Sequence, residues 1–141
     1  MGTKKLSYLL FLFILPMSCN AEEHAFKTAS EEILFKNFAL SICLGMGYKD
    51  ISKEFSKQVA SSANGYREYS HISLEAYEEA RTVVKKWLQK NYENKQGRQI
   101  PLMKCVDLYN NSELHNIFVK YNPCKSPDSW IDSNEFNKSC K

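Results

Sequence analysis

The sequence predicts an all-α protein: a compact bundle of about five helices, followed by an irregular C-terminal tail tied by disulfides. Two observations carry this prediction. Apolar residues recur three and four positions apart through most of the chain after residue 30, the spacing of one helix face. No run alternates apolar and polar residues, as a half-buried strand would, and no internal repeat or low-complexity tract interrupts the pattern.

The first 21 residues have the layout of a secretory signal peptide. Two lysines precede an apolar stretch at residues 6–17, and small residues follow before two glutamates. This stretch of 12 residues is too short for a membrane-spanning helix, which needs about 20. Cleavage after Ala21 is favoured, and lipidation of Cys19 is the alternative, although Pro16 fits poorly three positions before a lipidated cysteine. Residues 22–141 are then expected to form a single helical domain.

The charge and cysteine counts restrict the function class. The chain has 19 Lys and Arg against 16 Asp and Glu, and removing Lys4 and Lys5 with the signal peptide lowers the net charge from +3 to +1. We therefore expect no basic tail or patch and no nucleic-acid partner. Of the five cysteines, Cys19 leaves or is capped by lipid, so an even number enters an oxidising compartment.

The first helix follows a possible capping box at Thr28 and Glu31 and stops near Gly45 and Gly47. Its apolar stripe consists of Phe35, Phe38, Ala39, Ile42, Cys43 and Met46. Asp50 can cap a second, weaker helix that fades near residues 61–65 and carries Ile51, Phe55 and Val59.

The third helix has the clearest pattern, with Ser73 as its cap. Its stripe comprises Leu74, Tyr77, Ala80, Val84, Trp87 and Leu88. Pro101 can open a fourth helix with Leu102, Cys105, Val106 and Tyr109 on one face, and Ser112 a fifth with Leu114, Ile117, Phe118 and Tyr121. After Pro123 no period remains.

Four cysteines allow three pairings. Cys43 and Cys105 both lie on core-facing stripes, so we predict that they join the first helix to the fourth, and that Cys124 and Cys140 bracket the tail. A disulfide is the favoured interpretation of Cys105, because a nucleophilic thiolate needs a partly exposed, electropositive niche rather than a core stripe. An envelope enzyme that uses Cys105 or a pair of acidic residues stays the weaker alternative.

No cofactor or metal is expected. His24, His71 and His115 lack the spacing of metal ligands, and Gly45 and Gly47 are better explained by a helix end than by a phosphate loop. The residues alone thus predict an exported, disulfide-bonded helical domain without enzymatic activity, a class whose members generally bind a partner.

Four segments in fixed order resemble a known family. They are LSICLGMGYKD at 40–50, SANGYREYSHISLEAYEEARTVVKKWLQKNY at 62–92, LMKCVDLYNNSEL at 102–114 and SPDSW at 126–130. The chain resembles, over residues 38–130, the amidase immunity proteins of the bacterial type VI secretion system, and KCVDLYNNSEL at 104–114 is the most specific part. One departure is Asn110, where relatives often have histidine.

The resemblance implies a periplasmic, all-helical homodimer that binds a cognate peptidoglycan amidase, injected by a neighbouring cell, and blocks its active-site cleft. It implies no catalytic residue, no nucleic acid, and no membrane attachment unless Cys19 is lipidated. The alternative function is another exported helical inhibitor or binding module that acts on a cell-wall hydrolase.

Blocking a concave cleft calls for a protruding segment on a rigid scaffold. Two interhelical segments are candidates. The slightly favoured one lies within the family-like string and contains Tyr109, Asn110, Asn111, Ser112 and Glu113. The other spans residues 92–99, is polar around Gly97, and offers Asn94 and Arg98.

Overall fold

The computed structural model of the protein describes residues 24–140, and the described part is all-α, as predicted. Its six α-helices are α1 (Glu31–Gly47), α2 (Lys53–Glu68), α3 (Leu74–Leu88), α4 (Pro101–Asn110), α5 (Ser112–Tyr121) and α6 (Ser133–Ser139). Short 3-10 helices precede α1 and follow α5: η1 (Ala25–Thr28), η2 (Pro123–Lys125) and η3 (Pro127–Ser129). The predicted signal peptide and Cys19 lie outside the described residues.

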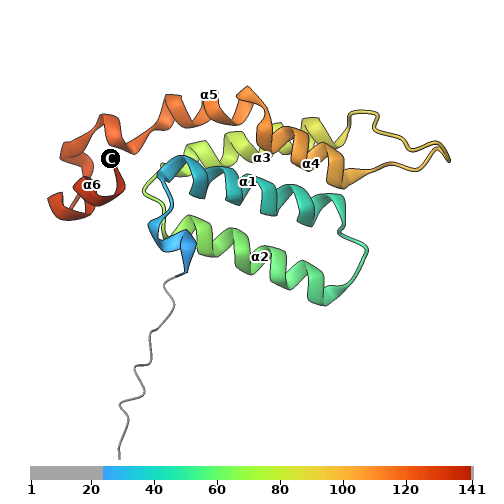
Figure 1. The fold of residues 1–141 in the computed structure, drawn as a ribbon, viewed down its shortest axis with the longest axis horizontal. Helices are drawn as coiled ribbons and strands as arrows, with labels where there is room; N and C mark the ends of the chain where they lie inside the picture. Colours follow the sequence, from blue (N-terminus) through green and yellow to red (C-terminus); the bar gives the residue numbers. More distant parts are fainter. Residues whose placement is uncertain (1–23, 141) are drawn as a thin grey trace, which may run out of the picture.

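Helix α1 is the centre of the bundle, and α2, α3, α4 and α5 all pack against it (Figure 1). It is apolar around most of its circumference, which suits a helix covered on several sides. Phe35, Phe38, Ala39 and Cys43 are buried there, as their stripe predicts. The cap differs from the expected Thr28–Glu31 box: the Ser30 hydroxyl accepts a hydrogen bond from the Ile33 amide, which frees Glu31 for the contacts described below.

Helices α2 and α3 flank α1 and differ from prediction mainly at their ends. Helix α2 starts after Ser52, whose side chain caps it, and continues to Glu68 rather than fading near residue 61. The residues Ala76, Tyr77, Ala80, Val84 and Trp87 form the buried face of α3. Ile51 and Leu74, assigned to apolar stripes from the sequence, are instead exposed, because Ile51 precedes α2 and Leu74 is the first residue of α3.

A disulfide joins Cys43 of α1 to Cys105 of α4, as the sequence predicts. The disulfide also sets how α4 is rotated about its axis. The face of α4 that we predicted to be buried was wrong. Lys104, Cys105 and Leu108 are buried, whereas Leu102 and Val106 are 50% and 44% exposed. Because the disulfide directs Cys105 at α1, the buried face of α4 turns toward Lys104 and away from the apolar stripe.

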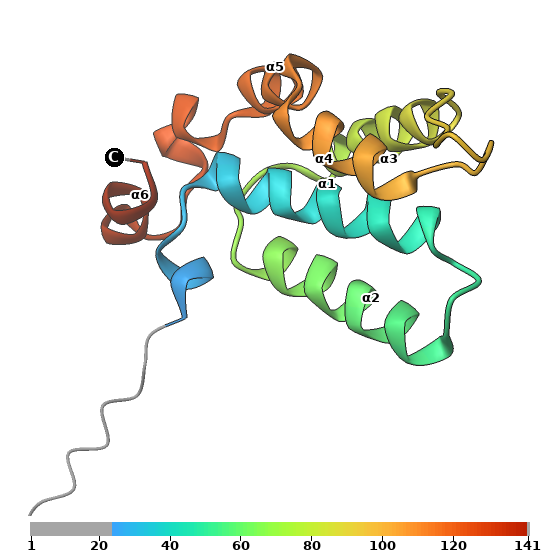
Figure 2. The same cartoon turned by 45° about the vertical axis from the view of Figure 1, so that its right-hand side comes forward.

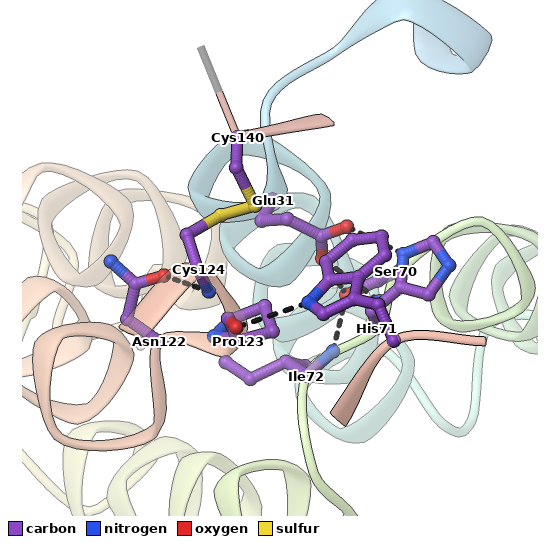
Figure 3. Close-up of a disulfide and its surroundings, with 9 residues drawn as sticks. Glu31, Ser70, His71, Ile72, Asn122, Pro123, Cys124 and Cys140 are labelled. Carbon is purple, nitrogen blue, oxygen red and sulfur yellow. Dashed lines mark hydrogen bonds and ion pairs between the residues drawn. A yellow bond between two sulfur atoms is a disulfide. The ribbon is translucent and has the colours of Figure 1, made fainter. Parts of the chain in front are cut away.

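The tail contains η2, η3 and the short helix α6, so it is more ordered than the irregular segment we expected. The second predicted disulfide, Cys124–Cys140, holds its two ends together beside Glu31 and His71 (Figure 3). The Trp130 ring lies against the His71 ring, with 3.8 Å between centroids and a tilt of 30°, and its indole N–H donates to the Pro123 carbonyl. The tail therefore covers the connection between α2 and α3.

The connection between α2 and α3 is also held by the carboxylate of Glu31, a residue that is 2% exposed. Its oxygens accept hydrogen bonds from the Ser70 hydroxyl and the His71 amide, and one lies 2.9 Å from His71 Nδ1. Glu135 of α6 reaches the other side of the same imidazole, with 3.4 Å from its Oε1 to His71 Nε2. A buried carboxylate with three partners is well satisfied, and we interpret this cluster as structural. Within residues 24–140, no helix combines the length and the apolar composition needed to cross a membrane.

Candidate functional site

The segment between α3 and α4 is a short hairpin that projects past the end of the bundle (Figures 1 and 2). Its two arms are hydrogen-bonded to each other: the Ile100 amide donates to the Tyr92 carbonyl at 2.8 Å, and the Asn94 amide to the Arg98 carbonyl at 2.9 Å. Glu93 and Gln99 pair in antiparallel fashion between them. We call residues 91–100 the α3–α4 hairpin.

The tip of the hairpin is closed by Asn94. Its side-chain oxygen accepts hydrogen bonds from the Gln96 and Arg98 amides, both at 2.9 Å, and its carbonyl accepts one from the Gly97 amide. Gly97 has a φ of +73°, a conformation that costs other residues energy. An asparagine and a glycine therefore hold the tip in one shape.

The base of the hairpin is fixed by Gln99 and Lys104, neither of which the sequence marked as functional. The side-chain nitrogen of Gln99, Nε2, donates to the side chains of Asn91 and Glu93, so Gln99 joins the two arms. The Lys104 ammonium, on a side chain that is almost fully buried, donates to Gln99 Oε1 at 2.6 Å and to the Leu88 carbonyl at 2.9 Å. Because Leu88 is the last residue of α3, this ammonium also caps the helix end, where a positive charge is favourable.

Asp107 of α4 influences the acidity of Tyr92 in the hairpin. The pKa of the Tyr92 hydroxyl is raised, most strongly by hydrogen bonding to Asp107 and less strongly by partial burial and by the charge of that carboxylate. The hydrogen bond from Lys104 to Gln99 connects the hairpin to α4 and orients it relative to the bundle.

The near-neutral charge of the chain conceals an uneven distribution along the sequence, which the expectation of no basic patch did not take into account. Residues 85–104 contain one acidic residue, Glu93, and six basic ones: Lys85, Lys86, Lys90, Lys95, Arg98 and Lys104. This segment of net charge +5 leaves 13 basic and 15 acidic residues elsewhere in the chain. The sequence held this signal, but averaging over the whole mature chain removed it.

The other predicted segment, at the junction of α4 and α5, uses its polar groups inside the domain. The Asn110 side chain donates to the Val106 carbonyl, and the Asn111 side chain caps α5 by accepting from the Glu113 amide. Ser112 is the exposed first residue of α5. Tyr109 is half-buried, with the Lys36 ammonium 4.8 Å from its ring centroid.

Glu113 connects α5 to α3. Its carboxylate accepts from the Trp87 indole N–H at 3.0 Å and pairs with the Lys86 ammonium at 3.1 Å. Burial acts to raise the pKa of Glu113, but the hydrogen bonds from Lys86 and Trp87 outweigh it and hold the pKa below its usual range. These contacts give Glu113 a structural part in the junction.

Cys105 has no exposure and is bonded to Cys43, so its sulfur is part of a disulfide rather than a thiol. Among residues 24–140, no three His, Cys, Asp or Glu side chains gather closely enough to hold a metal ion. The fold and the site together define a class: a disulfide-stabilised helical domain with a projecting, internally hydrogen-bonded hairpin that carries basic residues.

Comparison with known proteins identifies the family. Residues 33–118 match the family described as Tai4, type VI secretion system (T6SS) amidase immunity protein. The chain belongs to this family of amidase immunity proteins.

A solved structure, that of the effector–immunity system Tae4/Tai4 from Salmonella typhimurium, contains a chain of similar fold. The identity is 30%, the TM-score is 0.63, and the match covers 70% of this chain and 96% of that one. No curated protein matches the sequence. The family match ends at residue 118, so the disulfide-bonded tail lies beyond it.

Proposed function

We propose that this chain is a periplasmic immunity protein that binds a type VI secreted peptidoglycan amidase, occludes its active-site cleft, and has no enzymatic activity of its own. Family membership supports the inhibitory role. The two disulfides fit an oxidising compartment, and residues 1–21 would direct export and leave a domain of residues 22–141.

The α3–α4 hairpin is the segment we assign to the amidase cleft. The observation that carries this assignment is its combination of projection and internal order: the hairpin extends from one end of the bundle, yet its tip and base are hydrogen-bonded throughout. A segment already in its bound shape loses little conformational entropy on binding, which favours tight inhibition. Asn94 maintains this shape, and Arg98 is an exposed tip residue that can contact the amidase.

The junction of α4 and α5 is the second candidate segment. The sequence slightly favours it, but Asn110, Asn111 and Glu113 already have partners inside the domain. Binding through these groups would break a bond within α4, the cap of α5, or the Glu113 contacts that hold α5 on α3, at a cost in stability. For this reason the hairpin replaces the junction as our assignment.

We also propose a homodimer, on the basis of the resemblance. The apolar side chains that α4 leaves exposed, Leu102, Met103 and Val106, support the presence of a further interface. Sedimentation equilibrium at micromolar concentration tests it, and a monomer mass throughout would contradict it.

The function is tested with the amidase encoded beside this gene, measured by release of peptidoglycan fragments. The wild-type protein should inhibit hydrolysis stoichiometrically, whereas Asn94→Ala combined with Arg98→Ala should weaken inhibition at least tenfold. The thermal midpoint should change little, because the hairpin lies outside the core. Asn110→Ala, which removes one hydrogen bond at the junction, is the matched control and should inhibit within twofold of wild type.

Three other outcomes would count against these assignments. Absence of inhibition by the wild-type protein would refute the function, and inhibition of a cell-wall hydrolase of another class would favour the alternative. If a folded protein carrying both Asn110→Ala and Asn111→Ala no longer inhibits, whereas the hairpin variant still does, the contact with the amidase lies at the junction.

A further inference from the structure

Among the described residues, the two exposed cations at the hairpin tip have no carboxylate partner, whereas several cations elsewhere in the domain do. On the rest of the domain, Lys120 pairs with Glu79 at 2.8 Å, Arg81 lies 3.9 Å from Glu78, and His115 contacts Glu32 at 2.9 Å. Within residues 24–140, no ion pair involves Lys95 or Arg98, and both are exposed at the tip.

The same is true at the base of the hairpin. Lys104 is buried against the uncharged oxygens of Leu88 and Gln99, and the Lys90 ammonium lies over the Trp87 ring at 3.0 Å. Within the part of the chain that the structure describes, Lys86 alone among the six basic residues of this segment is paired with a carboxylate, that of Glu113. The hairpin end therefore presents a positive field that the rest of the domain does not cancel.

A positively charged protrusion cannot enter a dry, concave site without a compensating charge, because an unpaired buried charge costs several kcal/mol. The partner must supply carboxylates where Lys95 and Arg98 arrive. Opposite charges across an interface also accelerate the encounter of two proteins, which suits an inhibitor that must intercept an injected toxin before it acts.

We propose that the α3–α4 hairpin is the basic half of an electrostatically matched interface, and that the wall of the amidase cleft facing its tip is acidic. The inference rests on the proposed function and specifies its partner. An anionic polymer or membrane surface is the competing occupant, but nonspecific binding to such a surface needs no fixed backbone shape. Here Asn94, Gly97 and Gln99 hold the hairpin in one conformation.

The test measures association rates with a catalytically inactivated form of the amidase encoded beside this gene, by stopped flow, from about 50 to 500 mM salt. Electrostatically steered rates fall steeply with ionic strength, so the wild-type rate should drop about tenfold or more across this range. Lys95→Glu combined with Arg98→Glu should lower the low-salt association rate at least tenfold and flatten the salt dependence, with a smaller change in dissociation.

The matched control is Lys27→Glu combined with Lys138→Glu. It makes the same change in net charge at two exposed lysines of η1 and α6, at the opposite end of the molecule (Figure 1). Its association rate should stay within about threefold of wild type. If the hairpin charge reversal impairs folding, Lys95→Gln with Arg98→Gln tests the same point with a smaller expected effect, about three- to tenfold.

Two results would overturn the inference and leave the proposed function standing: an association rate that varies less than twofold with salt, or equal effects of the two charge reversals. If the wild-type protein does not bind the amidase at all, both the inference and the proposed function are refuted. A third result would assign the basic end to an anionic surface and refute the acidic cleft. In that result, purified sacculi or phosphatidylglycerol vesicles capture the wild-type protein but not the hairpin variant, while the variant binds the amidase as the wild type does.

Discussion

Replacing Lys104 with methionine should loosen the α3–α4 hairpin while leaving the helical bundle folded. Methionine fills most of the space of the lysine stem but has no donor. The change removes the 2.6 Å hydrogen bond to Gln99 Oε1 and the 2.9 Å bond to the Leu88 carbonyl. Gln99 Oε1 keeps a longer bond from the Tyr92 amide, at 3.4 Å, so the connection from α4 to the hairpin is what disappears.

The expected magnitude follows from burial and bonding. A hydrogen bond from a charged donor contributes about 1.5–3 kcal/mol. Lys104 is buried, but Gln99 is exposed, so water can partly replace the bond lost at Gln99 Oε1. Removing a buried ammonium also removes its own desolvation cost, which offsets part of this loss in the global unfolding free energy. We therefore expect global stability to fall by at most about 2 kcal/mol. Local opening of the hairpin should become easier by a similar amount, which is roughly a thirtyfold change in the opening equilibrium.

Native-state hydrogen exchange of individual amides separates these two effects. The Arg98 and Ile100 amides, which close the hairpin, should lose about 10- to 100-fold protection, whereas amides at the centre of α1 should change only with global stability. Lys120→Met is the matched control, because it removes an exposed ion pair with Glu79 and should leave hairpin exchange unchanged. Hairpin protection within threefold of wild type in a folded Lys104→Met protein would refute the reasoning. If that variant does not fold, Gln99→Ala probes the same connection.

Three further predictions concern the disulfides and the junction of α4 and α5. Replacing Cys43 and Cys105 together by serine should lower the unfolding free energy by about 4 kcal/mol, since the bridge closes a loop with a sequence separation of 62; a loss below 1 kcal/mol in denaturant titration would contradict this. Cys140→Ser should speed proteolysis within residues 126–139 at least tenfold yet leave amidase inhibition within twofold, because the tail and the hairpin lie at opposite ends of the molecule. Because the pKa of Glu113 is lowered in the folded state, its stabilising contribution is complete above the unfolded pKa and declines as pH falls through the folded value. The stability difference between wild type and Glu113→Gln should therefore shrink below about pH 4, and a pH-independent difference in urea titrations would argue against it.

The sequence by itself determined the helical class, the approximate position of the first five helices and the cysteine pairing. These features depend on local patterns: a stripe of apolar residues has the same period wherever the helix packs, and Cys43 and Cys105 each lie on such a stripe. The family resemblance was visible for the same reason, because it depends on the order of short segments along the chain.

The tertiary structure alone decided how α4 is rotated and what its residues do. From periodicity, Leu102 and Val106 belong to the core face, but a helix of ten residues has several nearly equivalent faces. The disulfide to α1 and the end of α3 select the one that buries Lys104, and in that rotation its ammonium has two oxygen acceptors.

Tertiary contacts also decided which interhelical segment projects. Both candidate segments are polar in sequence, and the difference between them lies in distant partners: Trp87 and Lys86 of α3 hold Glu113 in the junction, whereas the hairpin is bonded mainly to itself and to Lys104. A pattern along the chain records which side chains can donate and accept. Which acceptor each donor finds depends on elements brought together from far apart in the sequence, and only the folded chain brings them into contact.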